Sequence, residues 1–305
     1  ARLEIAAPHD AAWVSEPRQY YFGPGGTGTA PPLLSAKNRV FALSTYRDMA
    51  AMWLQAGDLM DEKANEGISK ADSHLSTLFA GKDFGEDILG AIQPEMQLVV
   101  ARQNFAQAEL RPAMKLPSFA LAVELRDPDA MRAELRRTFQ SLIGFLNVLG
   151  AQQGQPQLDL GNEKLDEGEI ITATYIPLQD ESNLERLPIN FNFSPSIAFV
   201  GGRAIVSSTK ELARELAGLD AGQNGDGQQN TAAMVDFPVL RDILNDNRGP
   251  LVAQNMLKEG HSQDEAESEI DTLLTLIGFL NNANAALQFS TDDDALKLAL
   301  EVNLE

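Results

Sequence analysis

Residues 283–304 read ANAALQFSTDDDALKLALEVNL, and this stretch decides the fold class. Apolar residues alternate with polar or small ones at the odd positions from 283 to 289, and again at the even positions from 296 to 304. Strict alternation predicts strands with one packed face and one solvated face, which is typical of an antiparallel sheet. The acidic run Asp292–Asp294 between the two arms predicts the turn of a hairpin.

Further stretches extend this prediction to a mixed fold. Residues 118–126, SFALAVELR, predict a strand. Asp127 and Pro128 then predict a helix start, because Asp accepts hydrogen bonds from the first-turn amides and Pro loses none there. Apolar residues on one helical face from Met131 to Leu146 predict a long amphipathic helix that lies across a sheet.

Other local patterns predict a hairpin, two helix starts and a loop. Residues 196–207, SIAFVGGRAIVS, predict a hairpin with a type I′ turn at its Gly pair. The pairs Ser208/Glu211 and Ser262/Glu265 have the spacing of capping boxes. We expect the helix that starts at Ser262 to run to about Asn281. Residues 151–168 are rich in Gln, Gly and acidic residues, which predicts a loop.

The hexapeptide LIGFLN occurs twice, at residues 142–147 and 276–281. Each copy lies toward the end of an expected amphipathic helix, and upstream of each lies a strand followed by an acid-capped helix start. We interpret this as an ancient duplication of a strand–helix–strand unit. The predicted fold class is therefore α+β, with a largely antiparallel sheet or sheets packed by long amphipathic helices and with internally duplicated strand–helix–strand units.

Composition divides the chain into three parts. Residues 1–34 include a Gly- and Pro-rich stretch and predict an irregular N-terminal segment. Residues 35–220 predict a first α+β half, and residues 231–305 predict a second. The polar residues 220–230, DAGQNGDGQQN, predict a linker between the halves, which we expect to share one continuous core.

The composition excludes several classes of protein. The 305 residues include 24 Lys plus Arg, 44 Asp plus Glu and no Cys, and the formal net charge is −20. Without Cys there is no disulfide framework, zinc finger or thiol nucleophile. The negative charge argues against a nucleic-acid partner, because binding a phosphate backbone takes clustered Lys and Arg. No stretch approaches the roughly 20 apolar residues that a membrane span needs, so we expect no span in this chain.

Two acidic stretches are candidates for a metal site. Asp220, Asn224 and Asp226 lie in the linker and have some features of a calcium loop, although the third position lacks an acid and Thr231 stands where a bidentate Glu is needed. Asp292, Asp293 and Asp294 form the second candidate. We interpret the first stretch as a linker and the second as an ordinary turn.

Trp13, Tyr20 and Tyr21 are candidates for ligand binding, because they form a small aromatic cluster beside the Gly-rich segment. Such a cluster either stacks on a ligand or fastens a terminal segment to the core. Residues 23–28 match the GxGxxG pattern, but two prolines follow where a phosphate site needs a helix N-terminus. We therefore expect no nucleotide and no other cofactor.

The sequence offers no catalytic motif. His9, His74 and His261 are far apart, and neither HExxH nor GxSxG occurs. We assign no catalytic residue.

Three segments resemble a known family: FGEDILGAIQPEMQLVVARQ at residues 84–103, LPSFALAVELRDPDAM at 116–131 and SIAFVGGRAIVSSTKELARELAGL at 196–219. They resemble an uncharacterised family of bacterial envelope proteins, described as a domain of unknown function. The resemblance touches roughly the central half of the chain. It implies a secreted or membrane-anchored α+β protein whose N-terminal signal or anchor would precede the residues given, and it implies no catalytic residue.

From these observations we expect a non-enzymatic binding or structural module of the bacterial cell envelope or exterior, with an unknown protein or cell-surface partner. One alternative is a hydrolase with a site formed between the two halves. Another is a calcium-dependent interaction domain. The expected location is extracytoplasmic: periplasmic, secreted or membrane-anchored.

Overall fold

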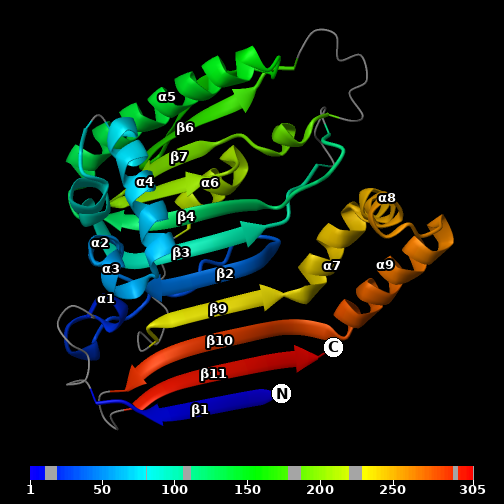
Figure 1. Cartoon of the computed structure of the whole chain (residues 1–305), viewed down its shortest axis with the longest axis horizontal. Helices are drawn as coiled ribbons and strands as arrows, with labels where there is room; N and C mark the ends of the chain where they lie inside the picture. Colours follow the sequence, from blue (N-terminus) through cyan, green and yellow to red (C-terminus); the bar gives the residue numbers. More distant parts are fainter. Residues whose placement is uncertain are drawn as a thin grey trace.

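A computed structural model describes residues 1–10, 19–79, 81–105, 111–177, 187–219, 229–290 and 295–304. Across these residues the chain forms one antiparallel sheet with helices packed on it (Figure 1). The strand order is β1-β11-β10-β9-β2-β3-β4-β8-β7-β6-β5. The expected α+β class with an antiparallel sheet is therefore confirmed.

The strands of the described sheet are β1 (Arg2–Pro8), β2 (Arg39–Tyr46), β3 (Ile92–Ala101), β4 (Ser118–Leu125), β5 (Leu158–Leu165), β6 (Gly168–Tyr175), β7 (Ser196–Val200), β8 (Arg203–Ser207), β9 (Thr231–Asp236), β10 (Leu280–Ser290) and β11 (Ala295–Leu304). The helices are α1 (Gln19–Phe22), α2 (Met49–Leu54), α3 (Ala56–Leu59), α4 (Glu62–Leu78), α5 (Pro128–Gln152), α6 (Lys210–Ala217), α7 (Phe237–Asp246), α8 (Arg248–Glu259) and α9 (Gln263–Gly278). Short helical turns are η3 (Pro24–Gly26), η4 (Phe84–Ile88), η5 (Leu89–Ala91) and η6 (Ile189–Asn192).

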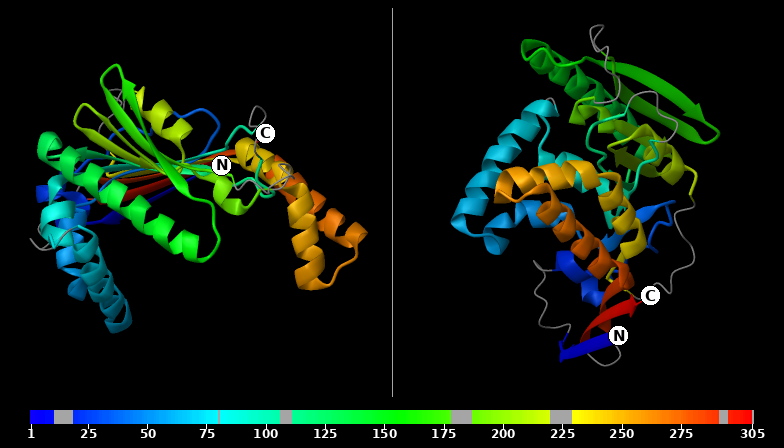
Figure 2. Two further views of the ribbon diagram at one scale, coloured as in Figure 1. Left: turned by 90° about the horizontal axis from the view of Figure 1, so that it is seen from above. Right: turned by 90° about the vertical axis from the view of Figure 1, so that its right-hand side faces the viewer.

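Helices cover the two faces of the sheet unequally. Figure 2 shows α4, α5 and α7–α9 on one side of the sheet and α6 on the other. On the α5 side, Met131 packs with Ile171, Ile197 and Phe199. On the opposite side, apolar residues of α6 pack on the sheet beside residues 34–36, which form part of the same cluster. The core therefore lies in two layers, one on each face.

Residues 31–36 reach this opposite face because their backbone carbonyls find partners there. Gln97 donates its side-chain amide to the carbonyl of Pro32 at 2.6 Å. The Ser44 hydroxyl donates to the carbonyl of Pro31. Since Pro has no amide hydrogen and cannot pair as a strand, these carbonyls are satisfied by buried side chains instead.

Local sequence set most of the helix starts. Asp127 and Asp236 accept hydrogen bonds from the first turns of α5 and α7, each with a Pro in that turn, and Ser262 with Glu265 forms the expected capping box. The capping box predicted for Ser208 and Glu211 is wrong, because the N-cap of α6 is the next residue, Thr209. The hydroxyl of Ser208 instead accepts from the amide of Phe119 at the end of the sheet.

Other differences lie at the edges of the sheet and at its turns. Residues 1–34, expected to be irregular, include β1 and α1, and the loop expected at 151–168 contains β5. Both strands are outermost and largely exposed, and β1 alternates polar and apolar residues only from Arg2 to Ile5. The turn between β7 and β8 has a positive φ at Gly201 alone of its two glycines, so it is not type I′.

Candidate functional site

An apolar row crosses ten strands of the sheet on the α5 side. Each residue of the row is the register partner of the next, and cross-strand partners share a face. The row is Ile171, Ile197, Val206, Leu121, Leu98, Leu43, Ala233, Ala285, Leu300 and Leu3. We call the side of the sheet that carries this row the apolar face.

The apolar face is only partly buried, and its buried residues include Val123 and Leu125 of the central strand β4. Ile171 and Ile197 lie under α5, but Val206 is 49% exposed and Phe119 is 51% exposed. At the far end, Leu3 is 53% exposed and Ile5 is 51% exposed. Figure 1 shows α4 and α5 in front of the upper strands, whereas β11 and β1 have no helix in front of them. Large exposed apolar patches mark interaction surfaces on proteins.

The long helix α5 continues this pattern. Its apolar stripe is buried at Met131 and, in the second half, at Ile143. Two other apolar residues of the second half, Phe145 and Leu149, are exposed. On α9, Leu276 is exposed as well, and so is Phe279 at its C-cap. Two helices that flank the sheet therefore also present apolar side chains to solvent.

A charged cluster bounds the apolar face at the end of β3. Arg102 follows that strand and donates to both carboxylate oxygens of Asp246 on α7, at 2.7 and 3.0 Å, and to Asp242 at 2.8 Å. The hydrogen bonds from Arg102 lower the pKa of Asp246 below its ordinary value. This cluster attaches α7 to the sheet.

Replacing Asp246 with Asn is expected to lower the free energy of unfolding by about 1 kcal/mol at neutral pH, because a bidentate charge-assisted pair is lost. A carboxylate whose pKa is lower in the folded state stabilises the fold above the pKa of the unfolded chain, and the effect is lost as pH falls. The difference between wild type and variant should therefore shrink between about pH 5 and pH 3. Urea unfolding of both proteins at a series of pH values measures this difference in the free energy of unfolding.

Asp242→Asn is the matched control, because this carboxylate accepts one hydrogen bond from the same Arg102 and its side chain is half exposed. Asp242→Asn should lower the free energy of unfolding by less than half as much as Asp246→Asn. If Asp246→Asn lowers the free energy of unfolding by the same amount from neutral to acid pH, the ion pair with Arg102 does not have the stabilising role described.

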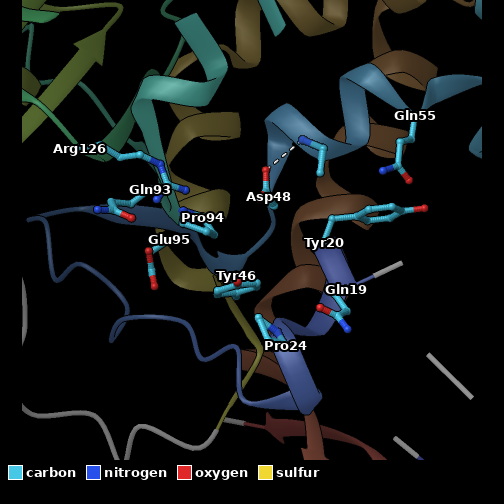
Figure 3. A pocket seen from close by; sticks show the side chains of 11 residues that line it. Gln19, Tyr20, Pro24, Tyr46, Asp48, Gln55, Gln93, Pro94, Glu95 and Arg126 are labelled. Atoms are coloured by element: carbon cyan, nitrogen blue, oxygen red, sulfur yellow. Dashed lines mark hydrogen bonds between the residues drawn. The ribbon is translucent and has the colours of Figure 1, made fainter. Parts of the chain in front are cut away.

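A polar pocket of about 450 Å³ lies at the other end of β2 and β3 (Figure 3). It is lined by Gln19, Tyr20, Pro24, Tyr46, Asp48, Ala51, Gln55, Gln93, Pro94, Glu95 and Arg126. Burial raises the pKa of the Tyr46 phenol, and the carboxylates of Glu95 and Asp48 raise it further, while Arg126 acts in the opposite direction. The pocket thus carries charges of both signs around a phenol that stays protonated at neutral pH.

The lining of this pocket offers carboxylates but no nucleophile of the serine or cysteine type. None of its lining residues is Ser, Cys or His, so the lining contains no Ser–His or Cys–His pair. The carboxylate of Asp48 accepts the amide hydrogen of Ala51 and is occupied as the N-cap of α2. All lining residues fall within 19–126, so this pocket does not lie between the two halves that the sequence predicts.

Two residues of the aromatic cluster predicted as a ligand site, Tyr20 and Tyr21, are described. Tyr20 is buried, lines the pocket and lies 4.8 Å from the ring of Tyr21. The guanidinium of Arg47 lies over the Tyr21 ring, 5.5 Å from its centroid, and donates to the Tyr21 carbonyl at 3.1 Å. Trp13 lies outside the described residues. Tyr21 therefore fastens the N-terminal segment to the sheet, and Tyr20 alone of the two reaches the pocket.

Two of the glycines at 23–28, Gly23 and Gly28, lie where a Cβ would clash with neighbouring atoms. A Cβ on Gly28 would lie 2.7 Å from both the Phe22 carbonyl oxygen and the Tyr46 ring. The amides of Gly23, Gly26 and Gly28 donate to carbonyls of this same segment, so they are not directed at a phosphate.

The metal candidates Asp220, Asn224, Asp226, Asp292, Asp293 and Asp294 all lie outside the described residues. Within the described part of the chain, no group of three or more His, Asp and Glu residues is arranged to hold a metal ion. The helices described also include none that is long and apolar enough to span a membrane.

Comparison of the chain with protein-family models, with curated proteins and with solved structures finds no match. The site must therefore be judged on its own geometry. The apolar face was not identified as a site from the sequence, although the alternation that produces it is visible in residues 283–304. The signal that could have revealed it is the number of alternating strands compared with the number of helices available to cover them.

Proposed function

We propose that the protein is a non-enzymatic binding or structural module of the bacterial cell envelope or exterior, and that the apolar face is the surface that binds its partner. The observation that carries this proposal is the apolar row across ten strands. It is exposed at Val206, Leu121, Leu300 and Leu3, and the residues between Leu121 and Leu300 are partly exposed. No pocket described on this part of the chain encloses the row, and of the row only Ala233 and Ala285 line a described pocket. A face without an enclosing pocket suits the surface of another macromolecule better than an enclosed small molecule.

The fluorescent dye anilinonaphthalene sulfonate tests whether the face binds apolar groups in the folded protein. We expect the wild type to enhance the dye's fluorescence, and we expect Phe119→Gln with Leu121→Gln to reduce the enhancement by more than half. Leu257→Gln on α8 is the matched control, because Leu257 is 88% exposed and is not part of the row. Equal fluorescence from all three proteins, each checked for folding by circular dichroism, would contradict the proposal.

A broad screen of ester, glycoside and peptide substrates separates this proposal from a hydrolase. A binding module should show no turnover above that of a heat-denatured sample. Turnover that one polar substitution abolishes, such as Glu95→Gln in the pocket, would overturn the non-enzymatic proposal.

The proposed location rests on the family resemblance of residues 84–103, 116–131 and 196–219. Cell fractionation tests it directly. Recovery from the periplasm, the membrane or the culture medium supports an envelope protein, and recovery from the cytosol contradicts it.

We also propose that the chain arose by internal duplication, but of other units than those marked by LIGFLN, since the first copy lies in α5 and the strand after it, β5, does not pair with β4. Two units, β2–α4–β3–β4 and β9–α9–β10–β11, follow the same path, and each places its second strand antiparallel to its first. Asp48 and Asp236 are the helix caps that follow the first strand of each unit. The units meet where β2 pairs antiparallel with β9, as a local twofold relation requires. Sequence profiles of the two units, built from many homologues, should align along their full length if the proposal holds.

A further inference from the structure

The two outer edges of the described sheet differ in how they are protected. At the β5 edge, the side chain of Asn147 on α5 bonds to both the amide and the carbonyl of Leu158, at 2.7 and 2.8 Å. This strand also carries Asp159, Glu163 and Lys164, and charges of this kind discourage pairing with another strand. At the opposite edge, no described strand pairs with the outer side of β1.

The outer side of β1 presents regularly spaced backbone groups. Ala1 and Val302 exchange two hydrogen bonds, at 2.6 and 2.8 Å, so these two residues form a hydrogen-bonded pair of the ladder between β1 and β11. In an antiparallel ladder such pairs alternate with pairs that are not hydrogen-bonded. The amide and carbonyl groups of Leu3, Ile5 and Ala7 therefore point toward β11, and those of Arg2, Glu4 and Ala6 point outward.

The side chains of β1 complement those of a second copy. Arg2 and Glu4 lie on the same face of the strand, with Nη2 and Oε2 3.2 Å apart. If two β1 strands pair antiparallel about Leu3, each Arg2 lies opposite a Glu4, and both pairs use the outward backbone groups. A register shifted by one step of two residues would place Glu4 opposite Glu4, which is unfavourable. Larger shifts bring Pro8, which has no amide hydrogen, into a pairing position.

We propose that β1 is a self-association edge, at which two copies of this chain pair antiparallel and centre their contact on Leu3. On the apolar face, Leu3 then contacts its counterpart across a pair that is not hydrogen-bonded, where side chains approach most closely. Leu3 and Ile5, both half exposed in one copy, become partly buried. The apolar rows of two copies thereby join into one surface. This inference does not rest on the proposed function, since the edge pairs whether or not the face binds another partner.

Single cysteines test the contact and its register, because the chain has no Cys of its own. Under mild oxidation with glutathione disulfide, Leu3→Cys should form a covalent dimer, since its Cα atoms lie within disulfide range across the axis. Ile5→Cys is the matched control, with nearly the same exposure. Its two copies would lie about 13 Å apart, so it should form little dimer. No dimer from Leu3→Cys, or equal dimer from both, would overturn the proposal.

Charge reversals test the same edge without a covalent bond. Sedimentation equilibrium should show that Glu4→Lys and Arg2→Glu each weaken the dimer by at least about tenfold, because each places like charges opposite one another twice. An equal mixture of the two variants should restore the dimer, since both cross-strand pairs become complementary again. Lys164→Glu at the β5 edge makes the same charge change as Arg2→Glu and should leave association unchanged. A mixture that stays monomeric, or a Lys164→Glu variant that dissociates equally, would contradict the β1 contact.

Discussion

Replacing Gly168 with Ala is expected to lower the free energy of unfolding by about 4 kcal/mol, the largest effect of any single change considered for this chain. Gly168 begins β6 with φ at 149°, a conformation that L side chains rarely adopt. A Cβ there would lie 2.0 Å from the carbonyl oxygen of Phe199 in β7, so backbone must move. Phe199 is 1% exposed, and the movement would disturb the core beneath α5.

Substitutions at two other glycines separate the cost of the backbone conformation from the cost of the contact with Phe199. Gly201 also has a positive φ, 57°, but a Cβ there meets nothing within 4 Å, so Gly201→Ala should cost about 1 kcal/mol. Gly144 lies in α5 with nothing near its Cβ position, and Gly144→Ala should stabilise by about 0.5–1 kcal/mol. Urea unfolding followed by circular dichroism compares the three. Equal losses at Gly168 and Gly201 would show that the contact with Phe199 contributes nothing.

Replacing Asn230 with Ala is expected to cost about 3 kcal/mol, because several buried polar groups lose a partner together. Asn230 is 1% exposed and donates to the carbonyls of Tyr21 at 2.8 Å and Gly28 at 3.2 Å. Its carbonyl oxygen accepts from the guanidinium of Arg47 at 2.6 Å. One side chain thus connects the N-terminal segment, the start of α2 and the start of β9.

Asn284→Ala is the control for this change, because Asn284 is exposed and donates one hydrogen bond, to Asn282. It should alter stability by less than about 0.5 kcal/mol. Limited proteolysis adds a local readout, since loss of Asn230 should expose the segment around Tyr21 to cleavage before the rest of the chain. A stable Asn230→Ala protein with unchanged cleavage would show that the segment is held by its apolar contacts alone.

The repeated hexapeptide shows where local sequence stops being informative. Residues 142–147 lie wholly within α5, and Asn147 closes the edge of β5. In the second copy α9 ends at Gly278, and residues 280–281 already belong to β10. The expectation that this helix reaches Asn281 is therefore wrong. The helix continues through the first copy but ends within the second, because the second copy runs into a strand, β10, that pairs with both β9 and β11.

The sequence by itself determined the fold class, the alternating strands at the C-terminus and the helix starts at Asp127, Asp236 and Ser262. These features depend on side-chain periodicity and on hydrogen bonds between residues at most a few positions apart. It also predicted that Asp292–Asp294 belong to a turn and possible cation site, which lies outside the described residues and stays a prediction.

Only the tertiary structure decided which apolar surfaces are covered. Alternation shows that a strand has an apolar side, but burial depends on what lies over that side. Here β9 lies between β2 and β10, and β1 from the N-terminus pairs with β11 from the C-terminus. These neighbours are far apart in the sequence, and no helix lies in front of β11 and β1 (Figure 1). The apolar face and its open β1 edge therefore follow from long-range pairing, which local patterns do not encode.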